Sequence, residues 1–279
     1  MKIGNVKNTK SIMSKYNIKT KKNFGQNFLT DENTLNSIVS KSNVNNEDYV
    51  LEIGCGIGAL TQLLCEKAKY VYAFEIDLTL RDYLNANVNY ENLTIFFKDF
   101  LKVNLNEYLP NKSYKVVANL PYYITTPILF KIIESELNFD ELYVMMQKEV
   151  GTRLRACPGS KEYNALSIML QISYEISELM SVSRNVFVPP PNVDSVVMKF
   201  VRHNKYEIDN MQFFSKFVHD CFQFKRKNLR NNLKKYDLLL VEELFAKVDL
   251  TLQDRAEQIS IEKFVFIANE YIKRCSDEK

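Results

Sequence analysis

Short apolar runs alternate with amphipathic segments over the first two thirds of the chain. The runs predict seven strands, at residues 49–53, 70–74, 93–97, 115–118, 142–146, 179–183 and 195–201. Amphipathic spacing predicts helices at 60–67, 78–87 and 163–174, and an earlier helix that starts at Thr30 or Asp31 and carries Leu35, Ile38 and Val39 on one face. Because strands that alternate with helices at this spacing pair in parallel, the pattern predicts an α/β fold with helices on both faces of the sheet.

The pattern changes towards the end of the chain. The last two predicted strands flank the turn-rich segment 189–192, so we expect a hairpin at the edge of the sheet. From about Asn210 only helical patterns remain, such as the one formed by Phe213, Phe217 and Phe222. We therefore expect an N-terminal arm over 1–22, a sheet-containing domain over 23–204 and a small all-helical domain over 205–279.

The net charge of +3 conceals two strongly basic segments. The arm has no acid but contains Lys2, Lys7, Lys10, Lys15, Lys19, Lys21 and Lys22. The second acid-free segment contains Lys225, Arg226, Lys227, Arg230, Lys234 and Lys235. A disordered tail and a solvated helix face would explain them equally well. Two separate basic patches on a nearly neutral chain nevertheless favour a polyanionic partner, because neutralising phosphates releases counterions.

Composition excludes several other classes of protein. Hydrophobic residues make up 46% and charged residues 25% of the chain, as in soluble globular proteins. No apolar run approaches the ~20 residues that span a bilayer, so no membrane partner is expected. The 5 cysteines are scattered and only 2 histidines accompany them, which disfavours a metal site and a disulfide framework. Reduced thiols indicate a cytoplasmic protein.

A glycine-spaced turn, Gly54-Cys55-Gly56-Ile57-Gly58, directly follows the first predicted sheet strand. Glycine lets the backbone approach a ligand closely, although such a turn alone can be merely a tight connection. Glu75 ends the next strand, about 20 positions further on, where a carboxylate accepts hydrogen bonds from ribose hydroxyls. A nucleoside-containing cofactor is therefore expected, and NAD would suit this geometry as well.

Two features favour S-adenosylmethionine over NAD. Asp99 ends the third strand, where it can accept from an adenine amino group, although a helix cap or surface acid would explain it too. The glycines at 54, 56 and 58 alternate, with an acid two residues before the first, and so depart from G-x-G-x-x-G. That form is commoner where the ligand has no pyrophosphate for the helix terminus to hold.

Asn119-Leu120-Pro121-Tyr122, at the end of the fourth strand, indicates the reaction. An adenine N6 amine is a poor nucleophile because its lone pair is delocalised into the ring. The Asn119 side-chain oxygen and the Leu120 carbonyl could accept both amine hydrogens and stabilise the charge that develops during methyl transfer. Pro121 would hold the turn rigid, and Tyr122 would offer a face on which the base stacks. The alternative is an ordinary strand-to-loop turn, for which Asn-x-Pro is common.

The chain resembles the KsgA family of small-subunit rRNA adenine dimethyltransferases from about Lys21 to its C-terminal helices. The resemblance rests on the glycine turn and on residues 22–29, 119–127, 146–150, 185–195 and 227–233. It implies a Rossmann-like class I methyltransferase fold, with a seven-stranded, mostly parallel sheet and a late antiparallel hairpin, followed by a helical rRNA-docking domain. It also implies dimethylation of two adjacent adenosines in the 3′-terminal hairpin loop of 16S rRNA during small-subunit maturation, by an enzyme that we expect to be a monomer.

The resemblance also implies roles for individual residues. Cofactor binding is expected at Gln26, Asn27, Leu29, Gly54, Gly56, Gly58, Glu75, Ile76, Asp99, Phe100 and Asn119. The target-base pocket is expected at Asn119, Leu120, Pro121, Tyr122 and Phe187, with Phe187 stacking on the second face of the flipped adenine. Contacts with rRNA are expected at Lys21, Lys22, Lys225, Arg226, Lys227, Arg230 and Lys234.

Departures from the family are mild, and two rival functions remain. Cys55 stands where the family usually has proline, as a small turn filler or a reactive thiol, and Asn228 replaces a common threonine. One rival is a large-subunit rRNA adenine methyltransferase of the antibiotic-resistance type, against which the loop 189–195 argues. The other is an assembly factor that acts mainly by binding the immature small ribosomal subunit.

Overall fold

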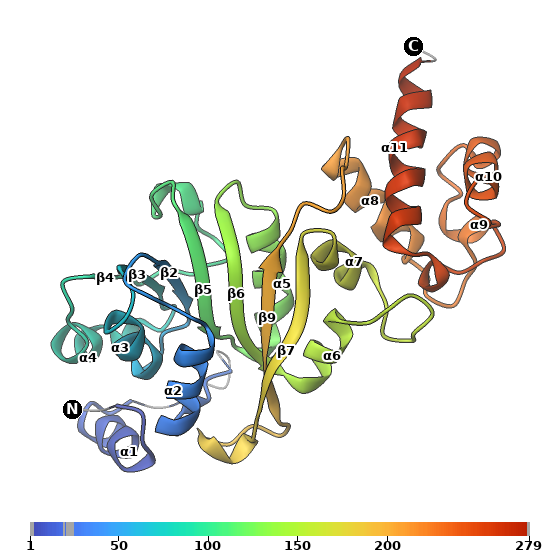
Figure 1. The fold of residues 1–279 in the computed structure, drawn as a ribbon. Helices are drawn as coiled ribbons and strands as arrows, with labels where there is room; N and C mark the ends of the chain where they lie inside the picture. Colours follow the sequence, from blue (N-terminus) through green and yellow to red (C-terminus); the bar gives the residue numbers. More distant parts are fainter. Residues whose placement is uncertain (1–2, 19, 21–24, 278–279) are drawn as a thin grey trace. The chain divides into compact units, whose positions relative to one another are not determined.

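A computed structural model describes residues 3–18, 20 and 25–277 of the chain (Figure 1). The strands are β1 Phe28–Leu29, β2 Tyr49–Ile53, β3 Tyr70–Phe74, β4 Leu93–Phe96, β5 Ser113–Asn119, β6 Asn138–Gln147, β7 Tyr174–Val182, β8 Phe187–Val188 and β9 Ser195–Arg202. The helices are α1 Val6–Lys15, α2 Glu32–Lys41, α3 Ala59–Cys65, α4 Arg81–Asn87, α5 Thr125–Ile133, α6 Lys148–Leu154, α7 Ala165–Gln171, α8 Met211–Cys221, α9 Leu229–Asn232, α10 Leu238–Ala246 and α11 Ile261–Asp277.

The seven long strands form one twisted sheet in the order β4-β3-β2-β5-β6-β9-β7. The pairs β3–β4, β2–β3, β2–β5 and β5–β6 are parallel, and β6–β9 is antiparallel. Helices lie on both faces, with α2 in front of the sheet and α5 behind it in Figure 1. The predicted Rossmann-like arrangement, with late strands at the edge of a mostly parallel sheet, is confirmed. The carboxyl ends of β2, β3, β5 and β6 therefore meet at one edge.

The helix predicted at 163–174 is wrong in length, and the strand after it starts earlier than predicted. Asn164 caps α7 by accepting hydrogen bonds from the N–H groups of Leu166 and Ser167, and the helix ends at Gln171. Strand β7 then begins at Tyr174, with exposed Glu175 and half-buried Ile176 in alternation. The apolar residues just before the strand extend the helical pattern in the sequence, which hides the change from a period of 3.6 to one of 2.

The lysine-rich N-terminus forms a helix, which the sequence analysis did not predict. Helix α1 is capped by Asn5, and the side chains of Ile3, Ile12 and Ile18 are buried in the core that α2, α3 and α4 share. The Tyr16 ring packs edge-on against Tyr83 of α4 at 5.0 Å. For residues 3–18 a disordered tail is therefore excluded. Exposed lysines of this segment lie on the outer face of a docked helix.

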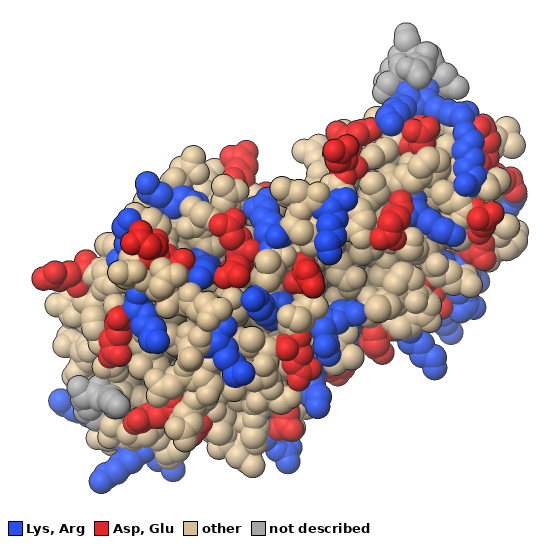
Figure 2. Space-filling model, viewed as in Figure 1, with Lys and Arg blue, Asp and Glu red and all other residues tan. Residues whose placement is uncertain are grey.

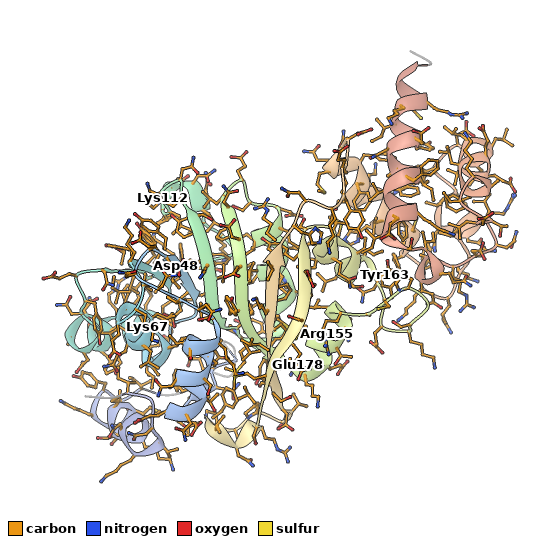
Figure 3. The ribbon with its side chains drawn as sticks, viewed as in Figure 1. Asp48, Lys67, Lys112, Arg155, Tyr163 and Glu178 are labelled. Atoms are coloured by element: carbon orange, nitrogen blue, oxygen red, sulfur yellow. The ribbon has the colours of Figure 1, made fainter. Side chains whose placement is uncertain are left out.

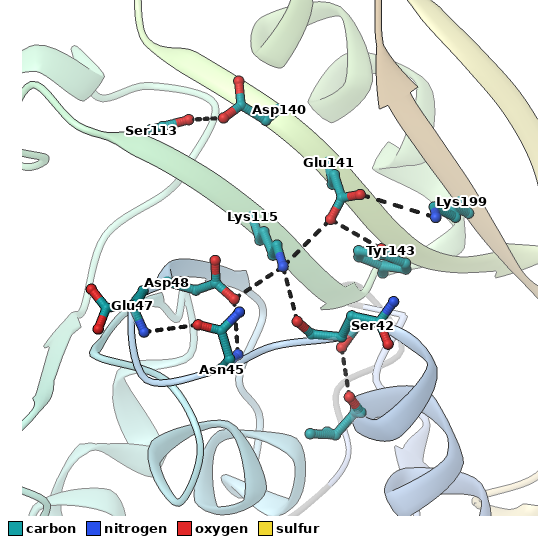
Figure 4. Close-up of polar contacts among 12 residues, drawn as sticks. Ser42, Asn45, Glu47, Asp48, Ser113, Lys115, Asp140, Glu141, Tyr143 and Lys199 are labelled. Carbon is teal, nitrogen blue, oxygen red and sulfur yellow. Dashed lines mark hydrogen bonds and ion pairs between the residues drawn. The ribbon is translucent and has the colours of Figure 1, made fainter.

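A network of charges crosses β5, β6 and β9 at the end of the sheet away from the carboxyl ends of β2 and β5 (Figure 4). Lys115 Nζ lies 3.0 Å from Asp48 Oδ2 and 3.5 Å from Glu141 Oε2. The Tyr143 hydroxyl donates to Glu141 at 3.1 Å, and Lys199 Nζ is 4.0 Å from the second Glu141 oxygen. Cross-strand pairs of this kind contribute about 0.2–1 kcal/mol each. Their main effect is on register, because a one-residue slip would turn these side chains to the other face.

The chain divides into two compact units. The first comprises residues 1–151 and 176–202, and the second comprises 152–175 and 203–279. In the second unit α8, α10 and α11 surround a core that contains Phe214, Phe217, Phe245 and Phe264, each fully buried. Among the described residues, no helix is long and apolar enough to cross a membrane.

Candidate active site

A cavity lies at the carboxyl ends of β2, β3 and β5, within the first unit. Its lining comprises residues 25–29, Leu35, Ile38, Glu52, residues 54–57, Ala59, Leu60, Glu75, Ile76, residues 118–122 and Met145. The cavity thus brings together most of the predicted cofactor and base-pocket residues from four separate segments of the chain. The charged side chains among these lining residues are both acids, Glu52 and Glu75. A ligand that carries positive charge would be stabilised by the Glu75 carboxylate, and by Glu52 when that residue ionises.

The glycine turn forms one wall of the cavity and depends on its glycines. Gly54, Gly56 and Gly58 all have positive φ, at 78°, 56° and 80°. A Cβ on Gly56 would lie 3.1 Å from the Phe28 ring, and one on Gly58 would lie 2.7 Å from the Val88 side chain. Gly58 faces α4 and begins α3, so it packs the turn onto the protein rather than lining the cavity. Gly54 and Gly56 both line the cavity, so the backbone of the turn is exposed there.

The Glu75 carboxylate is fixed at the end of β3 by two backbone donors. Its Oε2 accepts the Gly56 N–H at 2.7 Å, and its Oε1 accepts the Asp77 N–H at 2.8 Å. Burial raises the pKa of Glu75, whereas these two hydrogen bonds lower it. Each oxygen keeps a second lone pair, so the carboxylate is pre-oriented to accept from two hydroxyl groups.

Residues 25–29, which precede β2 in the chain, form another part of the cavity lining. The Gln26 side-chain nitrogen donates to Asp77 Oδ2 at 2.8 Å, which attaches this segment to the end of β3. Leu29 is buried and belongs to β1, which pairs with β8. Asp77 is not among the site residues predicted from the sequence. Its position two residues after Glu75 was the available signal, and the side chain proves to be fully buried.

Asn119 to Tyr122 form a further wall beside the glycine turn, because a Cβ on Gly54 would lie 3.8 Å from Pro121 and 3.9 Å from the Asn119 carbonyl. The Asn119 Nδ2 donates to the Asn27 carbonyl at 3.4 Å, which leaves its side-chain oxygen as the free acceptor of the amide. The Leu120 N–H donates to the Met145 carbonyl at 3.1 Å, and the Tyr122 hydroxyl lies 2.6 Å from Ser195 Oγ. The amide and the ring are therefore both held by specific contacts at the cavity.

The proline-rich loop before β9 is joined to this wall through Asp194 and Ser195. The Asp194 side chain accepts the Arg184 N–H at 3.0 Å, and its carbonyl accepts the Lys148 N–H at 3.1 Å. Phe187 lies in β8, opposite Leu29 of β1, and is only 2% exposed. It packs in the core and does not line the cavity, so its predicted stacking role requires the ring to become accessible and stays a prediction.

Asp99 and Phe100 also lie outside the cavity lining. Asp99 Oδ1 accepts the Leu101 N–H at 3.0 Å, and Lys102 Nζ is 3.7 Å from its Oδ2. Phe100 is buried and packs edge-on against Phe74 at 5.3 Å. Burial, and then the charges of Asp99 and Glu75, raise the pKa of the exposed residue Tyr123. A role for Asp99 towards the cofactor's adenine remains a prediction.

Glu52 is a buried acid that the sequence analysis noted only as part of the glycine-turn pattern. It is 1% exposed, lines the cavity and has no hydrogen-bond partner for its Oε2 among the described residues. Burial raises its pKa to about 8, with the Thr61 hydroxyl opposing the shift and Glu75 adding to it. Burial also raises the pKa of Cys55 well above its usual value, so the thiol is a neutral turn filler rather than a reactive thiolate.

The predicted RNA-contacting residues lie in two places. Lys21 and Lys22 fall outside the described residues. Lys225, Arg226, Lys227, Arg230 and Lys234 are all exposed in the second unit, between α8 and α10. Some have partners within that unit, because Lys225 Nζ donates to the Lys161 carbonyl and Arg230 is 3.7 Å from Glu242. In the view of Figure 2, basic and acidic side chains are interspersed rather than separated into one basic face.

The strand order and the cavity beside the glycine turn define the class of Rossmann-like methyltransferases. A family model described as "Ribosomal RNA adenine dimethylase" matches residues 17–273. The chain is 44% identical over 278 residues to Ribosomal RNA small subunit methyltransferase A of Bacillus mycoides, covering 95% of each protein. It is 46% identical over 253 residues to the protein of that name from onion yellows phytoplasma, covering 88% of this chain and 93% of the relative.

Solved structures agree with this class. A dimethyladenosine transferase from Plasmodium falciparum superposes with a TM-score of 0.76 at 26% identity, over 89% of this chain and 98% of that one. The 23S rRNA methyltransferase ErmE has a TM-score of 0.67 at 24% identity, over 88% and 100% of the two chains, and shows a shared fold. The chain belongs to the ribosomal RNA adenine dimethylase family.

Proposed function

We propose that the chain is an enzyme that uses S-adenosylmethionine to dimethylate the N6 amines of adenosines in small-subunit rRNA. The observation that carries this proposal is the cavity in which an amide acceptor, Asn119, and an aromatic ring, Tyr122, share a wall and which Glu75 also lines. The substrate class comes from the relatives at 44–46% identity, which are small-subunit rRNA methyltransferases by name. Two adjacent adenosines of the 3′-terminal hairpin, within an immature small subunit, are the proposed target.

S-adenosylmethionine fits the residues that line the cavity. A buried carboxylate at Glu75 with free lone pairs suits the ribose, and the backbone of Gly54 and Gly56 in the cavity lining allows close approach. The unpartnered oxygen of Glu52 and the acidic character of the cavity suit a ligand with a sulfonium and an ammonium group. When bound, the cofactor supplies an electrophilic methyl group. Residues 25–29 and Glu75 would hold it, with Ile76 beside them.

The chain's own part in the reaction is to hold the amine and stabilise its charge. The free oxygen of Asn119 accepts one amine hydrogen, and the Leu120 carbonyl accepts the other, so the nitrogen is drawn towards tetrahedral geometry. These acceptors also stabilise the positive charge that develops on the nitrogen. The Tyr122 ring, held by Ser195, gives the base a face on which to stack. No general base is required, because the proton leaves to solvent after the transfer.

Methyl transfer to isolated ribosomal subunits tests the proposed substrate. With subunits from cells that lack this protein, we expect labelled methyl groups to enter small-subunit rRNA and to appear as dimethyladenosine on mass analysis of its 3′-terminal fragment. Subunits from cells that contain the protein serve as the pre-methylated control. Preferential labelling of large subunits would instead support the resistance-type alternative, which shares the fold.

We further propose that the basic segment between α8 and α10 contacts rRNA phosphates. Arg226 and Lys227 are exposed, and neither has a side-chain partner among the residues described in this unit. We expect the double charge reversal Arg226→Glu/Lys227→Glu to weaken RNA binding and to lower the slope of log affinity against log salt by about 0.7–0.9 per lost phosphate contact. Affinity titrations at several salt concentrations measure this slope.

A matched control comes from the same unit. Lys205→Glu/Lys216→Glu changes the charge equally at two exposed lysines, one in α8 and one before it, and should leave the slope near that of the unmodified chain. Cofactor binding should be equal in both variants, because the cavity lies wholly in the first unit. A slope that is unchanged in the Arg226/Lys227 variant would show that this segment does not contact the phosphates.

A further inference from the structure

An exposed aromatic ring stands in the middle of the basic segment. Phe224 is 54% exposed, in the turn between α8 and α9, and is followed directly by Lys225, Arg226 and Lys227. No acid occurs from Cys221 to Tyr236. Single exposed apolar side chains are common and by themselves indicate nothing. Whether the exposed Phe224 ring has a function therefore depends on the residues around it.

The turn that carries Phe224 is fixed by a buried side chain. Asn232 is 5% exposed, and its side-chain oxygen accepts the Phe224 N–H at 3.1 Å. Its side-chain nitrogen donates to the Cys221 carbonyl at 2.7 Å and to the Phe224 carbonyl at 3.4 Å. The Lys227 N–H donates to the same Phe224 carbonyl at 2.8 Å. The ring is thus held outward by a braced turn, and its exposure does not arise from a loose chain.

Phe222, two positions before Phe224, points into the core of the second unit, whereas Phe224 is exposed. Phe222 packs against Tyr163, labelled in Figure 3, with ring centres 6.2 Å apart, and against Phe264 at 6.1 Å. Phe224 is exposed, whereas Phe222 is half-buried in this aromatic cluster. Burial of Phe222 fixes the turn onto the core of the second unit, which leaves Phe224 without a role in packing.

The three residues that follow Phe224 in the sequence carry positive charge. Lys225 Nζ donates to the Lys161 carbonyl, whereas Arg226 and Lys227 have no side-chain partner among the residues that the structure describes. An unpaired nucleotide fits this combination, because its base can stack on the exposed ring and its phosphates can pair with the cations that follow the ring in the sequence. Aromatic rings stack on any base, and the adjacent cations neutralise the backbone.

We propose that Phe224 is a base-stacking residue that binds an unpaired nucleotide of the substrate rRNA, with Arg226 and Lys227 on the adjoining phosphates. The proposal rests on the proposed function, which supplies the RNA. A basic patch would require only phosphates, whereas stacking on Phe224 also requires an unpaired base at this place. Duplex RNA, whose bases are stacked on each other, does not offer this contact.

Alanine substitution gives the first test. Phe224→Ala in the full chain should weaken binding to a 3′-terminal small-subunit rRNA fragment with unpaired flanks by at least about fivefold, the lower end of the effect of losing one aromatic–base stack. The salt slope should not change, because no phosphate contact is lost. Leu239→Ala is the control, since Leu239 is 82% exposed on α10 of the same unit but is followed by Glu242 and Glu243. Equal affinities for both variants would overturn the proposal.

The absence of tryptophan from the sequence allows a direct second test. Phe224→Trp introduces a single tryptophan at the proposed contact, and Leu239→Trp introduces one at the control position. We expect the unpaired-flank RNA to quench the fluorescence of the Phe224→Trp protein by stacking, with little change in the control. A fully paired duplex of equal length should quench neither.

The outcomes separate this proposal from the proposed function. If Phe224→Trp methylates small-subunit rRNA but is not quenched by RNA with unpaired flanks, the stacking assignment is wrong and the enzymatic one stands. If the RNA with unpaired flanks quenches the Leu239→Trp protein equally, the fluorescence change does not report on the Phe224 site, which also overturns the proposal. If quenching occurs without methyl transfer, the stacking contact stands and the proposed enzymatic function fails.

Discussion

Replacing Asn119 by alanine is expected to lower methyl transfer to small-subunit rRNA by about 10²-fold or more. That is the scale on which the loss of one hydrogen bond made in the transition state acts. The structure places the Asn119 amide on the cavity wall and engages its nitrogen with the Asn27 carbonyl, so the oxygen is the group that faces an incoming amine. Single-turnover rates at saturating cofactor measure the effect on the chemical step apart from any change in cofactor affinity.

The same variant separates catalysis from binding. We expect Asn119→Ala to bind immature small subunits as well as the unmodified chain does, because the substitution removes a side chain of a half-buried strand end and no basic residue. Asn106→Ala, at an exposed position, serves as the control. Retained methyl transfer would refute the role given to the amide. Loss of binding together with loss of transfer would mean that Asn119 supports the fold of the RNA-binding surface.

Glu52 is expected to make the free energy of unfolding of the cofactor-free protein fall as pH rises from about 5 to about 8. Its pKa is about 8 in the folded chain and 4.5 without burial, so between these values the folded state holds a proton that the unfolded state releases. One pKa unit corresponds to 1.36 kcal/mol, so up to about 4 kcal/mol of stability is lost over this range. Denaturant titrations of the unmodified chain and of Glu52→Gln at both pH values measure the difference.

Glutamine cannot ionise, so the Glu52→Gln protein should lack this component of the pH dependence and gain stability relative to the unmodified chain as pH rises. Glu66→Gln is the matched control, because Glu66 ends the neighbouring helix α3 and is exposed. It should follow the unmodified chain at both pH values. Parallel pH profiles for Glu52→Gln and the unmodified chain would show that the Glu52 carboxyl is not desolvated as the structure indicates.

Much of the fold followed from hydrophobic spacing, because the central strands are short, buried and bounded by turns. The strands at 49–53 and 70–74 have the predicted ends, and the sheet has the predicted mostly parallel arrangement. Helix α1 was missed because only Thr9 and Ile12 are buried within it, among lysines, while the other buried isoleucines, Ile3 and Ile18, lie before and after the helix. Its helical state depends on docking against α2, α3 and α4, which local spacing cannot reveal.

The candidate site was predictable where chemistry sits at the end of a strand. Glu75 and Asn119 end β3 and β5 or directly follow them, and parallel strands bring their carboxyl ends to one edge. Glu52 was harder to interpret, because an acid within a strand gives no sign of which face it points to until the neighbouring helix is placed. Phe187 shows a limit of the family resemblance. The resemblance predicts that this ring stacks on a base, but the ring is buried in β8, which pairs with β1.

The Tyr122 ring is not fixed by its own segment alone. Its hydroxyl is held by Ser195, which directly follows the Asp194 anchor that ties the proline-rich loop to Arg184 and Lys148. We therefore expect a nucleotide that displaces residues 189–194 to shift the Ser195 contact of the ring as well. For the proposed stacking role of Tyr122, this contact couples the seating of the loop to the orientation of the ring.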